Sequence, residues 1–411
     1  MEKIVLHVDF DSFFASCEQQ FNPKFRNKPI GVTATNGRSC IIASSREAKK
    51  LGIKTGSRTF EAFQVCPQLQ LAPANFVKYF EISKKFLAIC KNYSPFVELF
   101  SIDEVFMDVT LTAHLFGGEI ELIKKLKKEI REKIGEYITV SVGISHNKLL
   151  AKLASGMKKP DGMFKITKEN LEAVYSISKL TDICGIGERV KLRLNKIGIY
   201  TLLQLKSVPL TDLITEFGKV EGNFLKNIGL GIDPSSLNFF HRSPVVKSVG
   251  RNYCLPKNEY NQRVVLQNVY ELCEEICIKL RRLCKKARSV GIYLGGDISL
   301  HGRKTYNTYF DTGHEMFNLI TRLINIDNAQ YIRRIGLCAF NLEEKNNTSL
   351  SLFDSPKVNS LQKTIDEINE RFGDHTIRNG FLLYADRLTT VPNGFMADKY
   401  ERTKIAQENS W

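Results

Sequence analysis

The fold is decided by SIDEVFMDV at residues 101–109, which places two adjacent carboxylates, Asp103 and Glu104, inside a run that otherwise predicts buried β-structure. Asp9 and Asp11 follow the first apolar run of the chain in the same way. Carboxylates in apolar surroundings are costly to desolvate unless they are paired, hydrogen-bonded or bound to a cation. Three that converge would bind a hard divalent ion through oxygen.

The order of the predicted elements brings these acids together. Hydrophobic periodicity predicts strands at 3–8, 96–101, 105–109 and 138–144 and helices at 75–93 and 119–135. This is the β-α-β-β-α-β order of a split β-α-β unit, in which the third strand lies between the first two and antiparallel to both. Asp9, at the end of the first strand, is then beside the turn that carries Asp103 and Glu104. The acids could instead be capped turn residues, but their apolar flanks favour a metal site.

Length, charge and cysteine content set the outer bounds. A chain of 411 residues is long enough for about two to four domains with ample cores. The ten cysteines are scattered without pairs at zinc spacing, and no signal-peptide pattern is evident, which predicts a reduced, cytoplasmic protein. No apolar run approaches membrane-spanning length, so we expect no membrane partner. A net charge of +15 favours a polyanionic partner, although many basic proteins never bind nucleic acid.

An insertion at residues 12–74 separates the first strand from the first helix and is predicted to form a small subdomain. We expect residues 13–17 to continue the first strand. Short strands at 31–33 and 40–43, a tight turn at 36–37 and a helix over 45–52 follow. Arg46 and Lys49 are among the cations of that helix. They could hold a triphosphate over the acidic edge or form a solvated helix face, and this stretch alone does not decide between the two.

A second signal lies in residues 180–205, where a short helix, the turn Gly185-Ile186-Gly187 and another helix predict a helix-hairpin-helix. Glycine lets backbone N–H groups approach phosphates closely, and the N-terminus of the following helix favours anions. Such a hairpin binds the sugar-phosphate backbone without reading bases.

The same order of elements recurs between residues 244 and 341. This second β-α-β-β-α-β unit has no acidic residues at the corresponding edge and is basic instead, with Arg251 and Arg333 among its cations. A noncatalytic sheet that lies along a phosphate backbone is the natural interpretation.

The chain resembles a Y-family (lesion-bypass) DNA polymerase, most closely the bacterial DNA polymerase V catalytic subunit and its phage and plasmid UV-damage-repair relatives. The resemblance spans roughly residues 3–341. It is carried by five motifs in order, which are VDFDSFFA at 8–15, SIDE at 101–104, SVGISHNK at 141–148, KKPDG at 158–162 and ICGIG at 183–187.

The resemblance implies roles for the acidic edge. Asp9, Asp103 and Glu104, with the Phe10 carbonyl, would hold two Mg²⁺ ions, or Mn²⁺ in their place. These ions would activate the primer 3′-hydroxyl and neutralise the pyrophosphate leaving group.

The resemblance also implies the residues that bind the incoming deoxynucleoside triphosphate. Arg46, Lys49 and Lys159 would contact the phosphates. Phe14 matches the steric gate, a ring under the sugar that clashes with a ribose 2′-hydroxyl, and one of Phe13 and Phe14 would pack in the core. Arg46 and Lys49 stand where the polymerase IV branch commonly has tyrosine and arginine, and both still offer donors to phosphate.

The implied fold is α+β, a multidomain right-hand polymerase. Its parts would be a palm (1–11 and 75–165), fingers (12–74), a thumb with the helix-hairpin-helix (166–240), a little finger (241–342) and a C-terminal tail (343–411). Gly185, Gly187, Arg251 and Arg333 would contact primer-template DNA. The implied activity is template-directed DNA synthesis of low fidelity and without proofreading, in DNA damage tolerance and SOS mutagenesis.

The tail supplies a separate hypothesis about partners. SLSLF at 349–353 resembles the motif by which bacterial polymerases dock on the sliding clamp, with Leu350, Leu352 and Phe353 as its apolar side chains and Ser349 in place of the usual glutamine. An accessory subunit or a recombinase filament is a further partner that the resemblance suggests.

Two other classes of protein share parts of this pattern. A nucleotide cyclase would have the metal edge but no need of the hairpin or the basic second sheet. A catalytically inactive DNA-binding protein on the same scaffold would need the hairpin and sheet but not three acids that repel phosphate. A DNA polymerase accounts for all three features.

Overall fold

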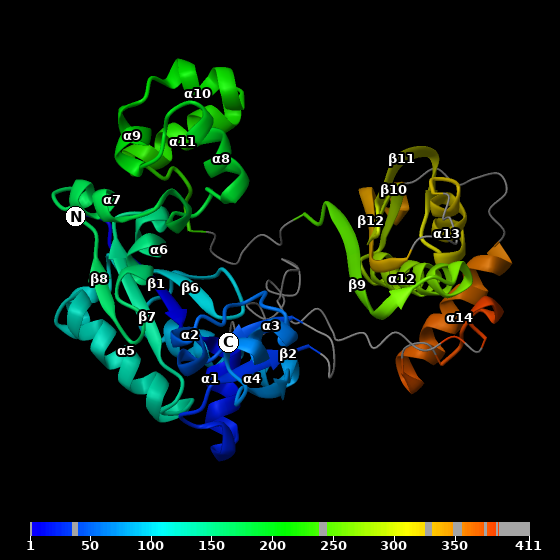
Figure 1. Cartoon of the computed structure of the whole chain (residues 1–411), viewed down its shortest axis with the longest axis horizontal. Helices are drawn as coiled ribbons and strands as arrows, with labels where there is room; N and C mark the ends of the chain where they lie inside the picture. The colour runs from blue at the N-terminus through cyan, green and yellow to red at the C-terminus, as the bar shows by residue number, and fades with distance from the viewer. Residues whose placement is uncertain are drawn as a thin grey trace. The chain divides into compact units, whose positions relative to one another are not determined.

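The computed structural model describes residues 2–34, 40–237, 245–324, 331–347, 356–373, 376–383 and 385. The turn expected at 36–37 and the clamp motif at 349–353 lie outside these residues. The chain divides into two compact units at residues 244 and 245 (Figure 1). Among the described residues, every helix is too short or too polar to traverse a lipid bilayer.

The first unit is built on a five-stranded sheet with the order β5-β6-β1-β7-β8. Its strands are β1 (Val5–Phe10), β5 (Val97–Leu99), β6 (Glu104–Asp108), β7 (Val140–Ser145) and β8 (Met163–Lys165). β6 lies between β1 and β5 and is antiparallel to both, which confirms the predicted topology. The register sets Asp9 directly opposite Glu104.

Side chains of β1 alternate between two differently covered faces. Leu6 and Val8 enter the main core beneath α4 (Phe76–Lys91) and α5 (Glu119–Lys133). The residues between them face α6 (Lys148–Met157), which packs on β1 and β7 (Figure 1). Gly143 of β7 permits this close approach, because a Cβ there would lie 2.0 Å from the carbonyl oxygen of Ala151.

The insertion after β1 forms a small sheet with the order β3-β2-β4 and three helices. Its elements are α1 (Phe13–Phe21), β2 (Ile30–Thr33), β3 (Ile41–Ser44), α2 (Arg46–Lys50), α3 (Thr59–Val65) and β4 (Gln70–Pro73). The expectation that residues 13–17 continue β1 is wrong. Ser12 adopts φ 52° and ψ 46°, a left-handed conformation that ends the extended chain and starts α1.

Short helices form the rest of the first unit and share a core with Leu150 and Leu153 of α6. They are α7 (Leu171–Ile177), α8 (Glu188–Lys196), α9 (Leu202–Ser207), α10 (Leu210–Phe217) and α11 (Lys219–Leu230). A 3₁₀ turn, η3 (Leu180–Asp182), precedes α8, so the expected helix-hairpin-helix is formed by η3, the glycine turn and α8.

The second unit has the predicted order of elements but not the strand order of the first. Its elements are β9 (Ser248–Glu259), α12 (Gln262–Arg282), β10 (Lys285–Gly296), β11 (Ser299–Phe310), α13 (Gly313–Thr321) and β12 (Ile332–Glu344). The strand order is β11-β10-β12-β9, so the fourth strand, not the third, lies between the first two. The β10–β11 hairpin joins the sheet through β10 pairing with β12. The edge that corresponds to the acidic edge of the first unit therefore does not exist here.

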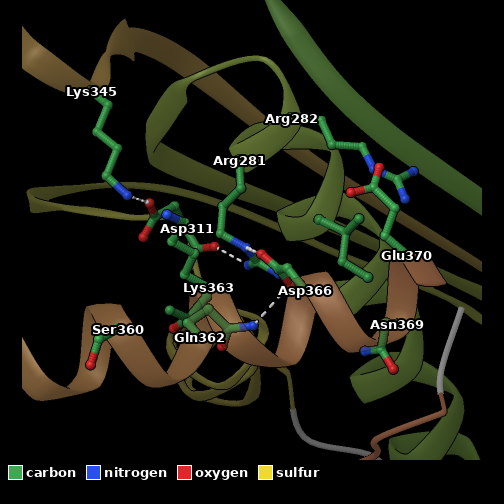
Figure 2. A pocket seen from close by; sticks show the side chains of 12 residues that line it. Arg281, Arg282, Asp311, Lys345, Ser360, Gln362, Lys363, Asp366, Asn369 and Glu370 are labelled. Carbon is green, nitrogen blue, oxygen red and sulfur yellow. Dashed lines mark hydrogen bonds and ion pairs between the residues drawn. The ribbon is translucent and has the colours of Figure 1, made fainter. Parts of the chain in front are cut away.

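A further helix, α14 (Pro356–Phe372), belongs to the second unit rather than to a separate tail. Arg281 of α12 donates to both carboxylate oxygens of Asp366 on α14, at 2.5 and 2.7 Å, and to the Asp311 carbonyl at 2.5 Å. Figure 2 shows these contacts beside a pocket of about 500 Å³ between the two helices. Beyond α14, Arg378 pairs with the buried Glu271 at 3.1 Å.

Candidate active site

Three acidic residues meet at one end of the first sheet. Asp9 pairs with Glu104 across β1 and β6, and the Phe10 N–H donates to the Asp103 carbonyl at 3.0 Å. Ligand atoms of His7, Asp9 and Glu104 all lie within 4.8 Å of one another. The side-chain period of two along β1 puts His7 and Asp9 on the face that α6 covers.

The burial of these acids governs their ionisation. Burial raises the pKa of Asp9 and, together with the charge of Glu104, that of Asp103. Burial would raise the pKa of Glu104 as well, but a hydrogen bond from His7 and the charge of Lys152 outweigh it and hold that pKa at about 2. Carboxylates this close together can all stay ionised only when cations lie beside them.

Two lysines supply positive charge to the cluster. The Lys159 ammonium donates to Asp9 Oδ2, and the Lys152 ammonium donates to Glu104 Oε2. The carboxylates offer hard oxygen ligands, which fit Mg²⁺ or Mn²⁺. His7 is less suited to be a ligand, because its Nε2 lies 2.8 Å from Glu104 Oε2 and is engaged there.

The three expected phosphate-binding cations gather at the same edge. Lys49 of α2 donates to Ser12 Oγ at 2.8 Å. Burial lowers its pKa, and the charges of Lys159 and Arg46 lower it further, so both of these cations lie within electrostatic reach of Lys49. They come from different segments, since Arg46 and Lys49 follow β3 and Lys159 follows α6.

The carboxylate of Asp11 has a different set of partners from that of Asp9, and a guanidinium nitrogen of Arg46 lies 3.7 Å from its Oδ2. Its carboxylate accepts hydrogen bonds from Thr139 Oγ1 at 2.6 Å, Ser141 Oγ at 2.7 Å and the Asp161 N–H at 2.7 Å. It therefore ties β7 to the turn that follows Lys159. Sequence reasoning did not predict this anchoring role of Asp11. The available signal was Ser141, a polar residue in the otherwise apolar strand β7.

The two adjacent phenylalanines of α1 are both buried in one aromatic cluster but stack on different rings. The Phe14 ring stacks on Tyr79 with centroids 4.5 Å apart, and the Phe13 ring stacks on Phe10 with centroids 4.7 Å apart. Phe14 also packs edge-on against Phe76, so both rings belong to the main core of the first unit.

His7 is a second residue to which sequence reasoning gave no role. It is fully buried and carries polar contacts to Glu104 and to Ser155 of α6. A histidine two residues before Asp9, on the same face of an apolar strand, was the available signal.

The candidate DNA-contact residues lie in the helical part of the first unit and in the second unit. Gly185 adopts φ +103°, and a Cβ there would lie 2.7 Å from the Phe224 ring, so the close packing of the hairpin turn against α11 favours glycine. Gly187 directly precedes α8, and a Cβ there would meet no atom within 4 Å. In the second unit, Arg251 of β9 donates to Glu275 of α12 at 3.1 Å, and Arg333 lies on β12.

Comparisons with known proteins identify the family. Residues 8–156 match the impB/mucB/samB family model, and residues 246–352 match the model of the C-terminal domain of that family. DNA polymerase IV of Pelotomaculum thermopropionicum is 32% identical over 380 residues, covering 91% of this chain and 94% of that protein. DNA polymerase IV 2 of Bacillus subtilis is 30% identical over 397 residues, covering 92% of this chain and 93% of that protein.

Solved structures agree with these relatives. A Y-family DNA polymerase chimera of Dbh and Dpo4 aligns with a TM-score of 0.69 and 28% identity, covering 82% of this chain and 98% of that chain. An insertion ternary complex of Dbh DNA polymerase aligns with a TM-score of 0.55 and 27% identity, with the same coverage. The relatives named here are polymerases IV, so the nearer resemblance to polymerase V is not confirmed. The chain belongs to the Y-family of DNA polymerases, the lesion-bypass class of DNA-directed DNA polymerases.

Proposed function

We propose that this protein adds deoxynucleotides to a primer 3′ end at the edge formed by Asp9, Asp103 and Glu104. The observation that carries the proposal is the meeting of these partly buried acids with Lys49 and Lys159 at one end of the sheet. An acidic cluster beside cations from separate segments suits a reaction in which metal ions and a triphosphate must be held together.

Each group in this site has a distinct part in the proposed reaction. Two divalent cations, Mg²⁺ or Mn²⁺, bound by the three acids and the Phe10 carbonyl, would activate the primer hydroxyl and neutralise the leaving pyrophosphate. Lys49, Lys159 and Arg46 would bind the phosphates of the incoming nucleotide. The Phe14 ring would exclude a ribose 2′-hydroxyl.

Primer extension by the purified chain, with and without Mg²⁺, tests the assignment. Asp103→Ala should lower the extension rate at least a hundredfold, because it removes charge stabilisation of the transition state, and should leave DNA binding largely intact. Asp108→Asn is the matched control, since Asp108 lies at the other end of β6 and accepts from the N–H and hydroxyl of Thr110. Retained extension in Asp103→Ala would remove the catalytic assignment. If the unaltered protein binds primer-template DNA but does not extend the primer, the result would favour the catalytically inactive DNA-binding alternative.

DNA would be held by contacts to its backbone. The N–H groups around Gly185 and Gly187, with Arg251 and Arg333 of the second unit, are the proposed contacts. Such contacts carry no sequence information, which suits a polymerase that must accept any template.

We further infer that synthesis is of low fidelity, tolerates damaged templates and lacks proofreading. The protein would act in the cytoplasm, in DNA damage tolerance and the SOS response. The support is the family and the small size of the 12–74 insertion, which implies few contacts to the nascent base pair. Extension past a panel of defined template lesions tests this inference. Failure on every lesion, or degradation of a mismatched primer end in Mg²⁺ without nucleotides, would contradict it.

The nearer relationship to polymerase V or polymerase IV has its own test. A polymerase V-like chain would need an accessory subunit or a recombinase filament, whereas a polymerase IV-like chain would extend primers alone. Extension by the isolated chain that a recombinase filament does not stimulate would rule out the polymerase V-like requirement.

A bacterial sliding clamp is the proposed partner of SLSLF at 349–353. Leu352 and Phe353, with Leu350, would enter an apolar pocket, and tethering would raise the local concentration of the enzyme at the primer end. Replacing both Leu352 and Phe353 by alanine should abolish clamp-stimulated synthesis and leave unassisted synthesis unchanged. Stimulation that survives the double substitution would show that the clamp docks elsewhere.

A further inference from the structure

His7 occupies the middle of β1, and both nitrogens of its buried ring have a partner. Nε2 lies 2.8 Å from Glu104 Oε2, and Nδ1 lies 2.7 Å from Ser155 Oγ on α6. The Phe106 ring packs against the imidazole with centroids 4.6 Å apart. The ring is therefore held between two strands and a helix, with 0% of the residue exposed.

The chemistry of these partners selects one tautomer of the ring. A neutral imidazole carries one N–H, and an ionised carboxylate can only accept. The contact with Glu104 is attractive only if the proton is on Nε2, which leaves Nδ1 to accept from the Ser155 hydroxyl. The same hydroxyl can instead donate to the Lys152 carbonyl at 2.8 Å. In that case Nδ1 would have to carry the single ring proton of a neutral imidazole, and the lone pair of Nε2 would face the Glu104 carboxylate, which is repulsive.

We propose that His7 is a positioning residue for Glu104, donating from Nε2 to hold the carboxylate in the orientation that a divalent cation requires. Glu104 Oε2 also accepts from Lys152, so two donors from different elements act on the same oxygen. Hydrogen bonds to a ligating carboxylate orient it and are typically worth a factor of 10–100 in metal affinity. The inference rests on the proposed function, because it takes Glu104 to be a metal ligand.

A matched pair of substitutions separates positioning from packing. In His7→Gln the amide nitrogen can reach the place of Nε2 and donate to Glu104, whereas in His7→Asn it reaches only the place of Nδ1. Mn²⁺ binding to the protein with primer-template DNA, measured by electron paramagnetic resonance without nucleotide, is the readout. We expect affinity to fall about 10–100-fold in His7→Asn and less than about threefold in His7→Gln. Equal affinities in the two variants would overturn the proposal.

Two further measurements keep the test decisive. Melting temperatures of both variants report any packing defect, which should be similar in the two because each replaces a buried ring by an amide. If either variant fails to fold, ¹⁵N spectra of histidine-labelled wild-type protein still report the tautomer. A proton on Nε2 is expected, and a proton on Nδ1 would overturn the proposal. The tautomer does not depend on catalysis. Failure of the polymerase assignment can therefore be distinguished from failure of the proposed role of His7.

Discussion

At the residue scale, Asp9 and Asp11 lie one residue apart, yet their carboxylates serve different parts of the site. Asp9 shares the acidic edge with Glu104 and accepts from Lys159. Asp11 instead holds the turn that follows Lys159 through the Asp161 N–H. The two acids of one motif therefore take different parts, Asp9 as a candidate ligand and Asp11 as an anchor.

The adjacent rings of α1 allow a paired prediction about sugar selection. Phe13→Val and Phe14→Val each remove part of a buried ring, so each should lower the free energy of unfolding by roughly 2–4 kcal/mol. Only Phe14→Val should also raise ribonucleotide incorporation, by roughly a hundredfold relative to deoxynucleotide. Single-nucleotide insertion kinetics with dNTP and NTP measure the ratio. Equal ratios in the two variants would show that neither ring is the gate.

At the element scale, alanine substitutions at the two glycines of the hairpin test different properties, which are folding at Gly185 and DNA contact at Gly187. Gly185→Ala should destabilise the hairpin by about 1–3 kcal/mol, because φ is +103° and the methyl would meet Phe224. Gly187→Ala should fold normally, since φ is −88° and the methyl would meet open space.

DNA affinity is the property that Gly187→Ala should change. If phosphates approach the N-terminus of α8, the methyl of Gly187→Ala should weaken DNA affinity roughly three- to tenfold while the melting temperature stays unchanged. Fluorescence anisotropy with labelled primer-template measures this. Unchanged affinity would mean that the hairpin does not bring its turn against the DNA backbone.

The docking of α14 on α12 gives another prediction at this scale. Arg281→Ala leaves Asp366 and the Asp311 carbonyl without this donor, so α14 should be destabilised by roughly 2–3 kcal/mol. Amide hydrogen exchange over 361–372 should accelerate accordingly. Lys363→Ala is the control, because its side chain is 79% exposed and its pair with Glu367 contributes little. Equal exchange in both variants would contradict the proposed importance of the Arg281 contacts.

The same scale shows what the sequence could and could not predict. The order of strands and helices was enough to place Asp9 beside the segment that carries Asp103 and Glu104, whereas the exact pairing of Asp9 with Glu104 comes from the structure. The start of α1 was missed, since it depends on the left-handed conformation of Ser12. The contacts of His7 with Ser155 on α6 and of Asp11 with Ser141 on β7 were missed too, because each joins residues more than a hundred positions apart in the chain.

At the scale of the whole molecule, the net charge of +15 predicts a strong dependence of DNA binding on salt. Each phosphate contact releases counterions, so the logarithm of affinity should fall steeply and linearly with the logarithm of salt concentration. Arg251→Ala should reduce that slope by about one, as expected for a lost phosphate contact.

Arg251 is paired with Glu275, which supplies the control for this measurement. Glu275→Gln keeps the guanidinium and should not reduce the slope. A slope that is unaffected by Arg251→Ala would remove this residue from the DNA interface without touching the polymerase assignment.

The strand orders of the two sheets bear on whether one arose by duplication of the other. Their elements follow one another in the same succession, which invites the idea that one half of the gene was copied from the other. In the first sheet, however, the third strand separates the first two, and in the second sheet the fourth does. A simple duplication would have preserved that connectivity. The halves are therefore not interchangeable modules, and a hybrid that grafts β10 and β11 in place of β5 and β6 would lack the pairing on which Asp9 and Glu104 depend.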